Sequence, residues 1–596
     1  MNRAPAAAVR VDDGWLVGAE PERWLVARRL DDVPAVLAAA EEEAARGRLA
    51  IGYLAYEAGP AFDPAIAAWP PGELPLAALA VFPALERADA VAAEGEWELG
   101  AWEEELPEAA YLQAVERVRG AIRGGETYQV NLTFRLRAPF GGSSWAFFAA
   151  LSAAHEAPYA AYLDLGRFVI CSASPELFLE VDGSRLRSRP MKGTARRHPD
   201  PRRDAARARG LRRSPKERAE NLMIVDMVRN DLGRVARVGS VRVPHLFALE
   251  RYPTVWQMTS TVEAESDRPL AEVVGALFPP ASVTGAPKVR ATELVRELEA
   301  SPRGVYTGAM GLIGPGRRAR LNVAIRTAVI DRRTATLSYG VGSGIVWDSR
   351  PRRELAECRL KAAVLGVRPR GFRLLETMRW DPRRGFVLWE EHLRRLRRSA
   401  EHLGFRFDGA RIAAEAREAA AAWREPMRVR LLLDRRGRTA WEAVPLRESP
   451  FPARVRLALA KEPVPSGELA LYHKTTKRSP YTAAWDGIAR EAVDDVLLWN
   501  ERGEVTETTV ANVVFELDGE LVTPPVRCGL LDGTLRRVLV RRGIVRERVV
   551  RLEDLGRCRR LWVVNSVRGW RFAQLVQTGA AGGADGARVA EAVRVR

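Results

Sequence analysis

The residues best suited to covalent chemistry in this chain are two of its few lysines, Lys192 and Lys474. The chain has seven lysines among its 93 basic residues, so arginine carries most of the positive surface charge. An arginine side chain stays protonated, whereas a lysine can lose its proton and act as an amine nucleophile or form a Schiff base. A lysine retained in such a sequence is therefore a candidate for catalysis.

Three glutamates are candidates for a metal site. Glu220 lies on a helix predicted over 217–229, and Glu354 and Glu357 lie three positions apart on a helix predicted over 352–365. Residues three apart on a helix share a face. Carboxylates that converge from two helices suit a Mg²⁺ ion that keeps some of its waters. For an isolated pair at this spacing, a solvated face that pairs with arginines is the simpler interpretation.

These side chains need elements that bring distant parts of the chain together. Hydrophobic periodicity predicts further helices over 108–123 and 389–403. Alternation of apolar and polar residues predicts a strand over 128–136, and a second strand is predicted among glycines over 341–347.

A short basic segment with Gly and Pro divides the sequence into two patterns. We therefore expect a first domain over 1–366, a linker over 367–371 and a second domain over 372–596. The Gly- and Ala-rich stretch 578–586 is expected to be a loose connection into a short final helix.

The composition indicates a soluble globular protein, with 47% hydrophobic and 28% charged residues. The sequence has no apolar run long enough to span a membrane and no signal-peptide pattern. Its four cysteines are scattered, which argues against a disulfide framework or zinc site and suits a reducing cytoplasm. The net charge of +17 is spread along the chain without a nucleic-acid motif, so no nucleic-acid partner is expected.

Seven motifs follow one another in the first domain. They are SASPELFL (172–179), RPMKGTARR (189–197), KERAENLMIVDMVRNDLGRV (216–235), SVTGAPKVRATE (282–293), NVAIRT (322–327), GVGSGIVWDS (340–349) and ELAECRLKA (354–362). This series resembles the chorismate-using synthases, which include anthranilate, aminodeoxychorismate, isochorismate and salicylate synthases. The resemblance covers roughly residues 10–366. It implies an α+β domain with two packed antiparallel sheets, outer helices and chorismate as substrate.

Two positions choose a reaction within that family. Isochorismate and salicylate synthases carry a lysine that activates water where this chain has Gln129, and glutamine is no general base. Anthranilate synthases usually have alanine at the position of Lys192. Aminodeoxychorismate synthases have lysine there, and in that family it is thought to attack C2 of chorismate. Glu176 is then the candidate general acid for the departing C4 hydroxyl.

The same resemblance implies the rest of the first site. Glu220, Glu354 and Glu357 would hold a Mg²⁺ that binds the C1 carboxylate of chorismate. Because chorismate is a dianion, it needs cationic and amide partners. The candidates for binding it are Arg326, Lys361, Thr284, Gly285, Gly342 and Gly344. Pro280 and Ala281 replace the glycines that usually precede the TGAPK motif.

Amination also needs a source of ammonia. A glutaminase requires a cysteine nucleophile with a histidine and an acid, and none of the four cysteines lies in a GxCxG elbow. The family resemblance therefore implies a separate glutamine amidotransferase subunit as partner.

The second domain carries another set of motifs. They are LLETMR (374–379), EHLRRL (391–396), YHKTTKR (472–478), VTETTVANVVF (505–515) and GLLDGTLRR (529–537). They resemble the fold-type IV pyridoxal-phosphate enzymes, which comprise branched-chain and D-amino-acid aminotransferases and aminodeoxychorismate lyase. The resemblance implies two smaller α+β subdomains with pyridoxal phosphate between them. Because such enzymes are commonly dimers, a homodimer through this domain is also expected.

In this resemblance Lys474 is the Schiff-base lysine and proton shuttle, and Glu507 faces the pyridine nitrogen. Thr377 is a candidate for assisting proton delivery. The cofactor phosphate would bind at a helix start, where free N–H groups and the helix dipole favour an anion. The phosphate candidates are Gly533, Thr534 and Arg395.

The order of the two domains suggests that they catalyse two successive reactions. The first would make 4-amino-4-deoxychorismate, and the second would remove pyruvate from it to give 4-aminobenzoate. One alternative is anthranilate synthase component I fused to a branched-chain or D-amino-acid aminotransferase domain. Another is a second domain that only binds or regulates, against which Lys474 and Glu507 argue.

Overall fold

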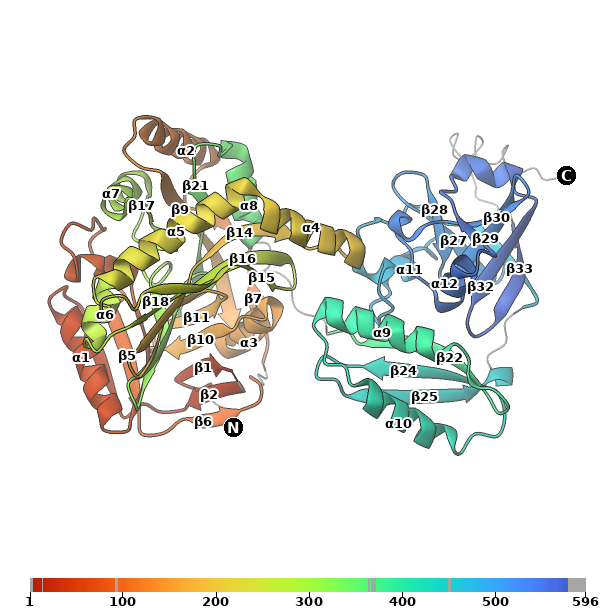
Figure 1. Cartoon of the computed structure of the whole chain (residues 1–596), viewed down its shortest axis with the longest axis horizontal. Coiled ribbons are helices and arrows are strands. Elements are labelled where there is room, and N and C mark those ends of the chain that lie inside the picture. The colour runs from red at the N-terminus through yellow and green to blue at the C-terminus, as the bar shows by residue number, and fades with distance from the viewer. Residues whose placement is uncertain are drawn as a thin grey trace. The chain divides into compact units, whose positions relative to one another are not determined.

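The computed structural model describes residues 4–12, 14–91, 95–362, 365, 371–448 and 452–576. The chain divides into two compact units (Figure 1). The first comprises Met1–Arg196 and Ala208–Pro369, and the second comprises Arg197–Arg207 and Arg370–Arg596. Most of the linker predicted over 367–371, and the stretch predicted over 578–586, lie outside the described residues.

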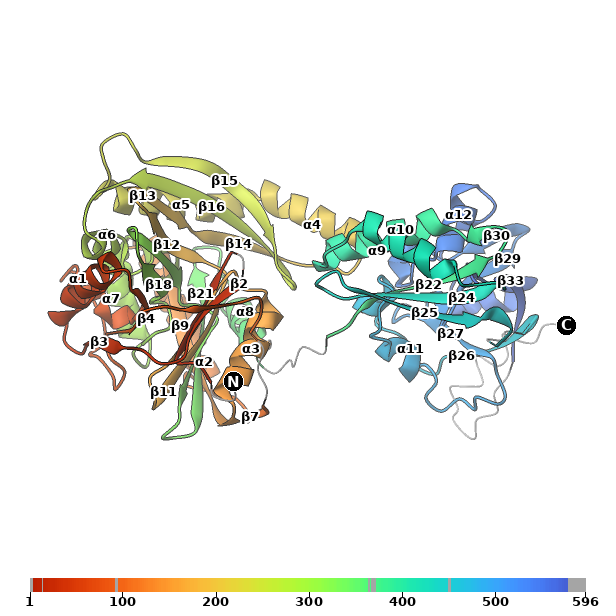
Figure 2. The same cartoon turned by 90° about the horizontal axis from the view of Figure 1, so that it is seen from below.

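Two antiparallel sheets form the first unit (Figure 2). One has 11 strands in the order β17-β9-β21-β20-β11-β10-β1-β2-β6, with β7 and β8 paired to β9. Its strands are β1 (Ala7–Val11), β2 (Gly14–Gly18), β6 (Glu86–Ala88), β7 (Trp97–Leu99), β8 (Glu103–Glu104), β9 (Gln129–Gly142), β10 (Tyr159–Asp164), β11 (Phe168–Ser174), β17 (Gly285–Ala286), β20 (Thr327–Asp331) and β21 (Thr336–Ile345).

The other sheet has 10 strands in the order β14-β16-β13-β12-β19-β18-β4-β5-β3, with β15 paired to β16. Its strands are β3 (Arg23–Ala27), β4 (Leu49–Leu54), β5 (Ala77–Phe82), β12 (Leu177–Asp182), β13 (Arg185–Arg189), β14 (Met191–Arg196), β15 (Arg242–Arg251), β16 (Val255–Glu265), β18 (Ala309–Gly314) and β19 (Arg318–Val323). Buried side chains of β1 and β10 pack against those of β4 and β18, so the two sheets face each other.

Helices cover the outer faces of both sheets. They are α1 (Asp32–Ala45), α2 (Glu108–Arg123), α3 (Ser144–His155), α5 (Pro215–Gly233), α6 (Leu270–Leu277), α7 (Lys288–Leu298) and α8 (Pro351–Ala362). Helices α2, α3, α7 and α8 share one core with the 11-stranded sheet, and α1, α5 and α6 share another with the 10-stranded sheet. The predicted arrangement of two packed antiparallel sheets with outer helices is confirmed.

Strand β9 shows how the sequence separates core from site. Val130, Leu132 and Phe134 lie in the core shared with α2 and α8. Because side chains alternate along a strand, the polar residues between them point to the opposite face. Gln129 and Asn131 are among these, and both are buried. The polar face of β9 thus lines the interior of the unit.

The described residues of the second unit form two sheets. A 4-stranded sheet has the order β23-β22-β24-β25, and an 8-stranded sheet has the order β28-β27-β26-β33-β32-β29-β30-β31. The strands are β22 (Leu374–Asp381), β23 (Gly385–Phe386), β24 (Met427–Leu433), β25 (Thr439–Pro445), β26 (Arg454–Leu459), β27 (Asp495–Trp499), β28 (Val505–Thr508), β29 (Asn512–Leu517), β30 (Glu520–Thr523), β31 (Arg546–Glu547), β32 (Arg560–Asn565) and β33 (Gly569–Leu575).

Four helices accompany these sheets within the described residues: α9 (Trp389–Leu403), α10 (Gly409–Ala420), α11 (Ser479–Ala483) and α12 (Thr534–Arg541). Helix α9 packs on β22, and α12 packs on β32. The segment 197–207, with the start of helix α4 (Pro201–Arg213), also belongs to this unit. The predicted pair of α+β subdomains is confirmed.

The predicted elements agree with the structure except at some ends. Helices α2 and α9 have the predicted bounds. The strand predicted over 341–347 is wrong at both ends, because β21 spans Thr336–Ile345 and Trp347 follows it. Strand β9 runs further than predicted because its second half pairs with β7 and β21. Among the described residues, no helix is long and apolar enough to cross a membrane.

A buried ion pair ties β9 to the segment after α7. Glu299 accepts hydrogen bonds from Arg303 at 2.6 and 3.0 Å and from the backbone N–H of Thr133 at 2.8 Å. Arg135 lies 3.8 Å from the same carboxylate, and all these side chains are buried. Removal of one partner from such a pair leaves an uncompensated buried charge, which costs more than the pair contributes.

We therefore predict that Glu299→Ala lowers the unfolding free energy of the first unit by about 3–5 kcal/mol. The matched control is Glu297→Ala two positions away, whose half-exposed carboxylate pairs with Arg290 at 3.7 Å and should contribute about 0–1 kcal/mol. Thermal and urea unfolding of both variants measures the difference. Equal melting of the two variants would contradict this account of the buried pair.

Candidate active sites

Lys192 lies on β14 at the edge of the 10-stranded sheet and reaches the opposite sheet. A Cβ atom added to Gly344 of β21 would lie 2.5 Å from Lys192 Nζ and 3.0 Å from Gln129 Nε2. A side chain at position 344 would therefore displace one or both of these groups. Burial lowers the pKa of Lys192 below its ordinary value; Glu220 opposes this shift and Lys361 adds to it. The lowered pKa makes the neutral amine more available.

Glu176 lies at the turn between β11 and β12. Its charge and that of Lys192 interact, and each affects the pKa of the other. Its side chain is buried, and Oε1 accepts a hydrogen bond from the backbone N–H of Met191 at 3.3 Å. Burial raises the pKa of Glu176 to about 7, against the opposing effects of Ser282, Met191 and Lys192. A carboxyl group with such a pKa can carry a proton at neutral pH and donate it.

Gln129 is the most incompletely bonded side chain of this site. Both atoms of its amide are buried and have no hydrogen-bond partner among the described residues. Its backbone pairs with Ala286 of β17, and a Cβ atom on Gly285 would lie 2.2 Å from its carbonyl oxygen. Buried polar groups normally have partners. An amide without partners beside an amine is therefore expected to bind a ligand with polar groups.

The three predicted metal ligands come from two helices, α5 and α8. Glu354 accepts a hydrogen bond from Ser343 at 2.5 Å, Glu357 pairs with Lys361 at 2.8 Å, and Glu220 lies 3.8 Å from Lys216. In the described part of the chain, no three acidic, His or Cys side chains form a ready metal site.

The same carboxylates nevertheless act on one another electrostatically. Burial raises the pKa of Glu220, and Glu217 and Glu354 add to that rise. Burial also tends to raise the pKa of Glu357, but the charges of Lys361 and Lys192 outweigh burial and lower that pKa below its ordinary value. This donor set, acidic but open, fits a Mg²⁺ that keeps several waters better than a closed cage of protein ligands.

The predicted substrate-binding residues have different surroundings. Arg326 is nearly buried, contacts His155 Nδ1 at 2.9 Å and lies near Tyr252 and Tyr339. Lys361 donates to the carbonyl of Gly342 at 2.8 Å, which holds it against β21. The hydroxyl of Thr284 already donates to Pro280 O at 3.1 Å. Its role in substrate binding stays a prediction.

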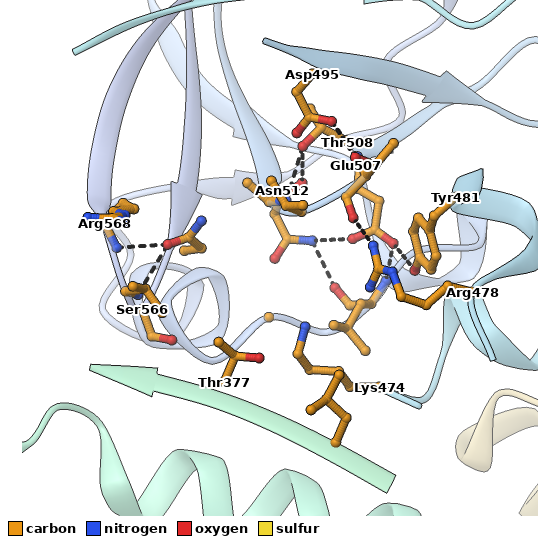
Figure 3. A pocket seen from close by; sticks show the side chains of 18 of the residues that line it. Thr377, Lys474, Arg478, Tyr481, Asp495, Glu507, Thr508, Asn512, Ser566 and Arg568 are labelled. Carbon is orange, nitrogen blue, oxygen red and sulfur yellow. Dashed lines mark hydrogen bonds between the residues drawn. The ribbon is translucent and has the colours of Figure 1, made fainter. Parts of the chain in front are cut away.

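The second unit has a cavity of about 630 Å³ with Lys474 in its wall (Figure 3). Arg395, Glu507, Gly533 and Thr534 line the same cavity. Burial lowers the pKa of Lys474 to about 8, and Arg395 and Arg478 contribute to that shift. The backbone carbonyl of Lys474 accepts a hydrogen bond from Leu375 N at 2.9 Å, which fixes it beside β22. The predicted second-site residues thus meet in one cavity.

Glu507 of β28 is held by three donors. Tyr481 Oη donates to Oε1 at 2.8 Å, Leu531 N donates to the same atom at 3.0 Å, and Asn512 Nδ2 donates to Oε2 at 3.1 Å (Figure 3). Burial raises the pKa of Glu507 to about 7 despite these bonds. A buried carboxyl group fixed in this way fits a cationic ring nitrogen, such as that of pyridoxal phosphate.

The predicted phosphate site is the start of α12. Gly533 precedes the helix, and no side chain caps its first N–H groups. A Cβ atom on Gly533 would lie 1.9 Å from Asn512 Oδ1, so the close approach requires glycine. Arg395 also lines the cavity, but its guanidinium donates to Glu376 at 2.8 and 2.5 Å. An uncapped helix start fits a phosphate group.

Sequence reasoning missed the residues that hold Lys474 in place. The preceding residue, His473, accepts a hydrogen bond from Ser399 at 3.0 Å and donates from Nε2 to Pro199 O at 2.9 Å. His402 stacks on it at 4.8 Å. Pro199 belongs to the segment 197–207, so no local pattern could have predicted this contact. His392, which contacts Glu376 at 2.6 Å, lies within the EHLRRL motif and could have been found there.

Comparison with known proteins gives a family for each half. Residues 78–366 match the family described as chorismate binding enzyme, and residues 373–576 match the family described as amino-transferase class IV. The first match falls almost entirely in the first unit and the second in the second unit, so each half of the chain is similar to one of these two families.

Aminodeoxychorismate synthase of Streptomyces griseus is 44% identical over 271 residues, which are 45% of this chain and 36% of that protein. Aminodeoxychorismate synthase component 1 of Escherichia coli is 40% identical over 258 residues, 43% of this chain and 56% of that protein. Anthranilate synthase component 1 of Thermus thermophilus is 41% identical over 259 residues, which are 43% of this chain and 55% of that protein. The chain matches 36%, 56% and 55% of the length of these three relatives, and identity alone does not choose between the two reactions.

The surroundings of Glu507 generate a prediction about stability and pH. A carboxyl group whose pKa rises on folding weakens the folded state as the pH rises from its unfolded pKa to its folded pKa. For Glu507 that interval runs from 4.5 to about 7. We therefore expect Glu507→Gln, measured without cofactor, to become more stable than the parent as the pH rises through this interval. Above the interval, its free energy of unfolding should exceed that of the parent by roughly 3 kcal/mol.

Glu504→Gln is the matched control, three positions away on the same stretch of chain. Its pKa is lowered to about 2, because Arg502 and Asn500 outweigh the effect of burial. Its contribution to stability is present above pH 4.5 and lost as the pH falls towards about 2, so the substitution should destabilise at neutral pH. Melting curves between about pH 4 and pH 8 test both signs. A pH-independent effect of Glu507→Gln would contradict the raised pKa.

Proposed function

We propose that the chain makes 4-aminobenzoate in two steps, by amination of chorismate in the first unit and loss of pyruvate in the second. The observation that carries the proposal is the position of Lys192. Its amine lies beside the unpartnered amide of Gln129 and near a carboxyl group, that of Glu176, whose pKa is about 7. A lysine nucleophile paired with a general acid is the equipment for replacement of a hydroxyl group by an amine.

In the first step, the neutral amine of Lys192 adds to C2 of chorismate. Both ring double bonds shift, and the C4 hydroxyl leaves as water with a proton from Glu176. Ammonia then adds at C4 and both double bonds shift back, which releases Lys192. The ammonium group on C4 gives up a proton, so the net change is one hydroxyl for one amine. Gln129 offers an amide to the ring substituents but no base for water.

A Mg²⁺ held by Glu220, Glu354 and Glu357 would neutralise the C1 carboxylate of chorismate. The open donor set supports this assignment. Lys361 and Arg326 would bind the remaining anionic groups, and the glycines at positions 342 and 344 let the substrate approach the backbone of β21.

Ammonia would come from a separate glutamine amidotransferase. The related protein of Escherichia coli is named component 1, which supports a partner component. The cysteines of this chain are poorly suited to glutamine hydrolysis, because burial raises the pKa of Cys358 and Cys558 to about 11 and that of Cys528 to about 12. A thiol with such a pKa holds its proton at neutral pH and is a weak nucleophile. The homodimer expected through the second unit belongs to the same proposal.

In the second step, pyridoxal phosphate would act as an electron sink for the carbon that bears the amine. Lys474, with a pKa of about 8, would hold the cofactor and then remove the proton at C4 of aminodeoxychorismate. Glu507 would keep the ring nitrogen protonated. Loss of the C3 enolpyruvyl group makes the ring aromatic, and a proton delivered to its methylene carbon gives pyruvate. Thr377 lines the cavity and is the candidate for that delivery.

A second candidate function is anthranilate synthesis, with an aminotransferase in the second unit. It is favoured by the 41% identity to anthranilate synthase component 1 of Thermus thermophilus. The position of Lys192 beside Gln129 argues for the first candidate.

Product analysis tests the proposal. The protein would be incubated with chorismate, Mg²⁺, an ammonium salt and pyridoxal phosphate, and the aromatic products would be separated. We expect 4-aminobenzoate and pyruvate in equal amounts. Lys192→Ala should abolish both, and Lys474→Ala should stop the reaction at aminodeoxychorismate. Each loss should be about 1,000-fold or more, as for removal of other nucleophiles.

Lys461→Ala is the control, since this lysine is exposed and lines neither site. Anthranilate as product would show that amination occurs at C2 and would favour the second candidate. Accumulation of aminodeoxychorismate by the parent protein would leave the first step standing and overturn the second.

A further inference from the structure

Four arginines gather on one side of the cavity that contains Lys474. Arg379 of β22 and Arg428 of β24 are cross-strand neighbours, and Arg571 lies on β33. Arg568 precedes β33 and lines the cavity with Arg428. We call these four residues the arginine cluster. In the view of Figure 3, Arg568 lies beyond Thr377 and Lys474, away from the side of Glu507.

The arginine cluster has too few acidic partners. Within the described residues, its one ion pair joins Arg379 to Asp381 at 3.1 Å, and Arg428, Arg568 and Arg571 have none. The Nε atoms of Arg379, Arg428 and Arg571 are buried without a hydrogen-bond partner. The neighbouring Arg430 differs, because Glu442 pairs with it at 3.0 Å.

Such a group of like charges is unfavourable without an anion. Like charges directly opposite each other on a sheet destabilise it, and unpaired donors in a buried place cost free energy. The pKa of Arg568 shows the strain: burial lowers it, and Arg428, Arg571 and Arg379 lower it further. Guanidinium groups bind carboxylates through two parallel hydrogen bonds, so a carboxylate would satisfy these donors.

We propose that the arginine cluster binds the carboxylates of a dianionic amine, and so selects the substrate of the second unit. The inference rests on the proposed function, because aminodeoxychorismate carries two carboxylates and one amine. A branched-chain amino acid has one carboxylate and an aliphatic side chain, which the cluster would not satisfy. Arginines in this place thus favour the lyase substrate over that of a branched-chain aminotransferase.

The strand geometry supports one orientation of such a substrate. Thr377 and Arg379 are two positions apart, so they project from the same face of β22. Their cross-strand partners are Arg430 and Arg428. Lys474 is bonded to the same strand through Leu375. An amine at Lys474 would therefore place the rest of the substrate along β22, past Thr377 and towards the arginine cluster.

The first test uses Arg568→Gln and Arg428→Gln in the full chain with cofactor and aminodeoxychorismate. Each variant should raise KM roughly 10- to 100-fold, because one charge-assisted carboxylate contact is lost, while kcat stays within about threefold. Arg546→Gln is the control, since this exposed arginine pairs with Glu520 on β30 and should leave both constants unchanged.

The second test needs no catalysis. Isophthalate, a dicarboxylate without an amine, would be titrated into the cofactor-free protein by calorimetry. Arg568→Gln should weaken the isophthalate binding seen in the parent about tenfold or more, and Arg546→Gln should leave that binding unchanged. The same substitution should leave the melting temperature equal or higher, because it relieves repulsion. The melting temperature thereby separates a loss of binding from misfolding.

The outcomes distinguish the inference from the proposed function. If the parent makes 4-aminobenzoate and both substitutions leave KM and isophthalate binding unchanged, the inference is wrong and the function stands. If the variants lose affinity for pyridoxal phosphate instead, the arginine cluster holds the cofactor phosphate and the inference is also wrong. If the parent makes no 4-aminobenzoate but transaminates branched-chain amino acids, the proposed function fails and the inference fails with it.

Discussion

The removal of ionisable groups from water governs both sites of this protein. Desolvation disfavours the charged form of any group, so it raises the pKa of a carboxyl and lowers that of an amine. At the first site it raises the pKa of Glu176 to about 7 and lowers that of Lys192. At the second it raises the pKa of Glu507 to about 7 and lowers that of Lys474 to about 8. In each unit, burial thus favours the protonated acid and the neutral amine.

The fold produces that burial in different ways. In the first unit the site lies between two sheets, where glycines at positions 285 and 344 allow strands and side chains to approach closely. In the second unit the site is a cavity at a sheet edge and a helix start. There, Glu376 holds Arg395 and His392, and His473 is held by the distant segment 197–207. The chemistry is simple in both cases, and the surrounding structure is what sets the protonation states.

Much of this could be predicted from the sequence, because the motifs are local. Lys192, Glu176, Lys474 and Glu507 stand in short runs with recognisable residues around them. The helices at 108–123 and 389–403 were equally predictable, since their apolar positions repeat with the helical period. The end of β21 was not, because it depends on where the pairing with β9 stops.

What could not be predicted depends on contacts between distant parts of the chain. The amide of Gln129 has no hydrogen-bond partner among the described residues because of where it lies between the two sheets, and the sequence around Gln129 does not indicate this. The arginine cluster draws on three strands and a turn, in a sequence where arginine is too common to attract notice. The metal ligands were predicted as a group, yet their present partners are Ser343, Lys361 and Lys216.

Burial keeps a proton on Glu176 close to neutral pH. Infrared difference spectra between the parent and Glu176→Gln, recorded over a pH series, would isolate the stretching band of the protonated carboxyl group. We expect this band to be present at mildly acidic pH and to disappear as the pH rises through about 7. Disappearance near pH 4.5, the ordinary pKa of a glutamate, would contradict it.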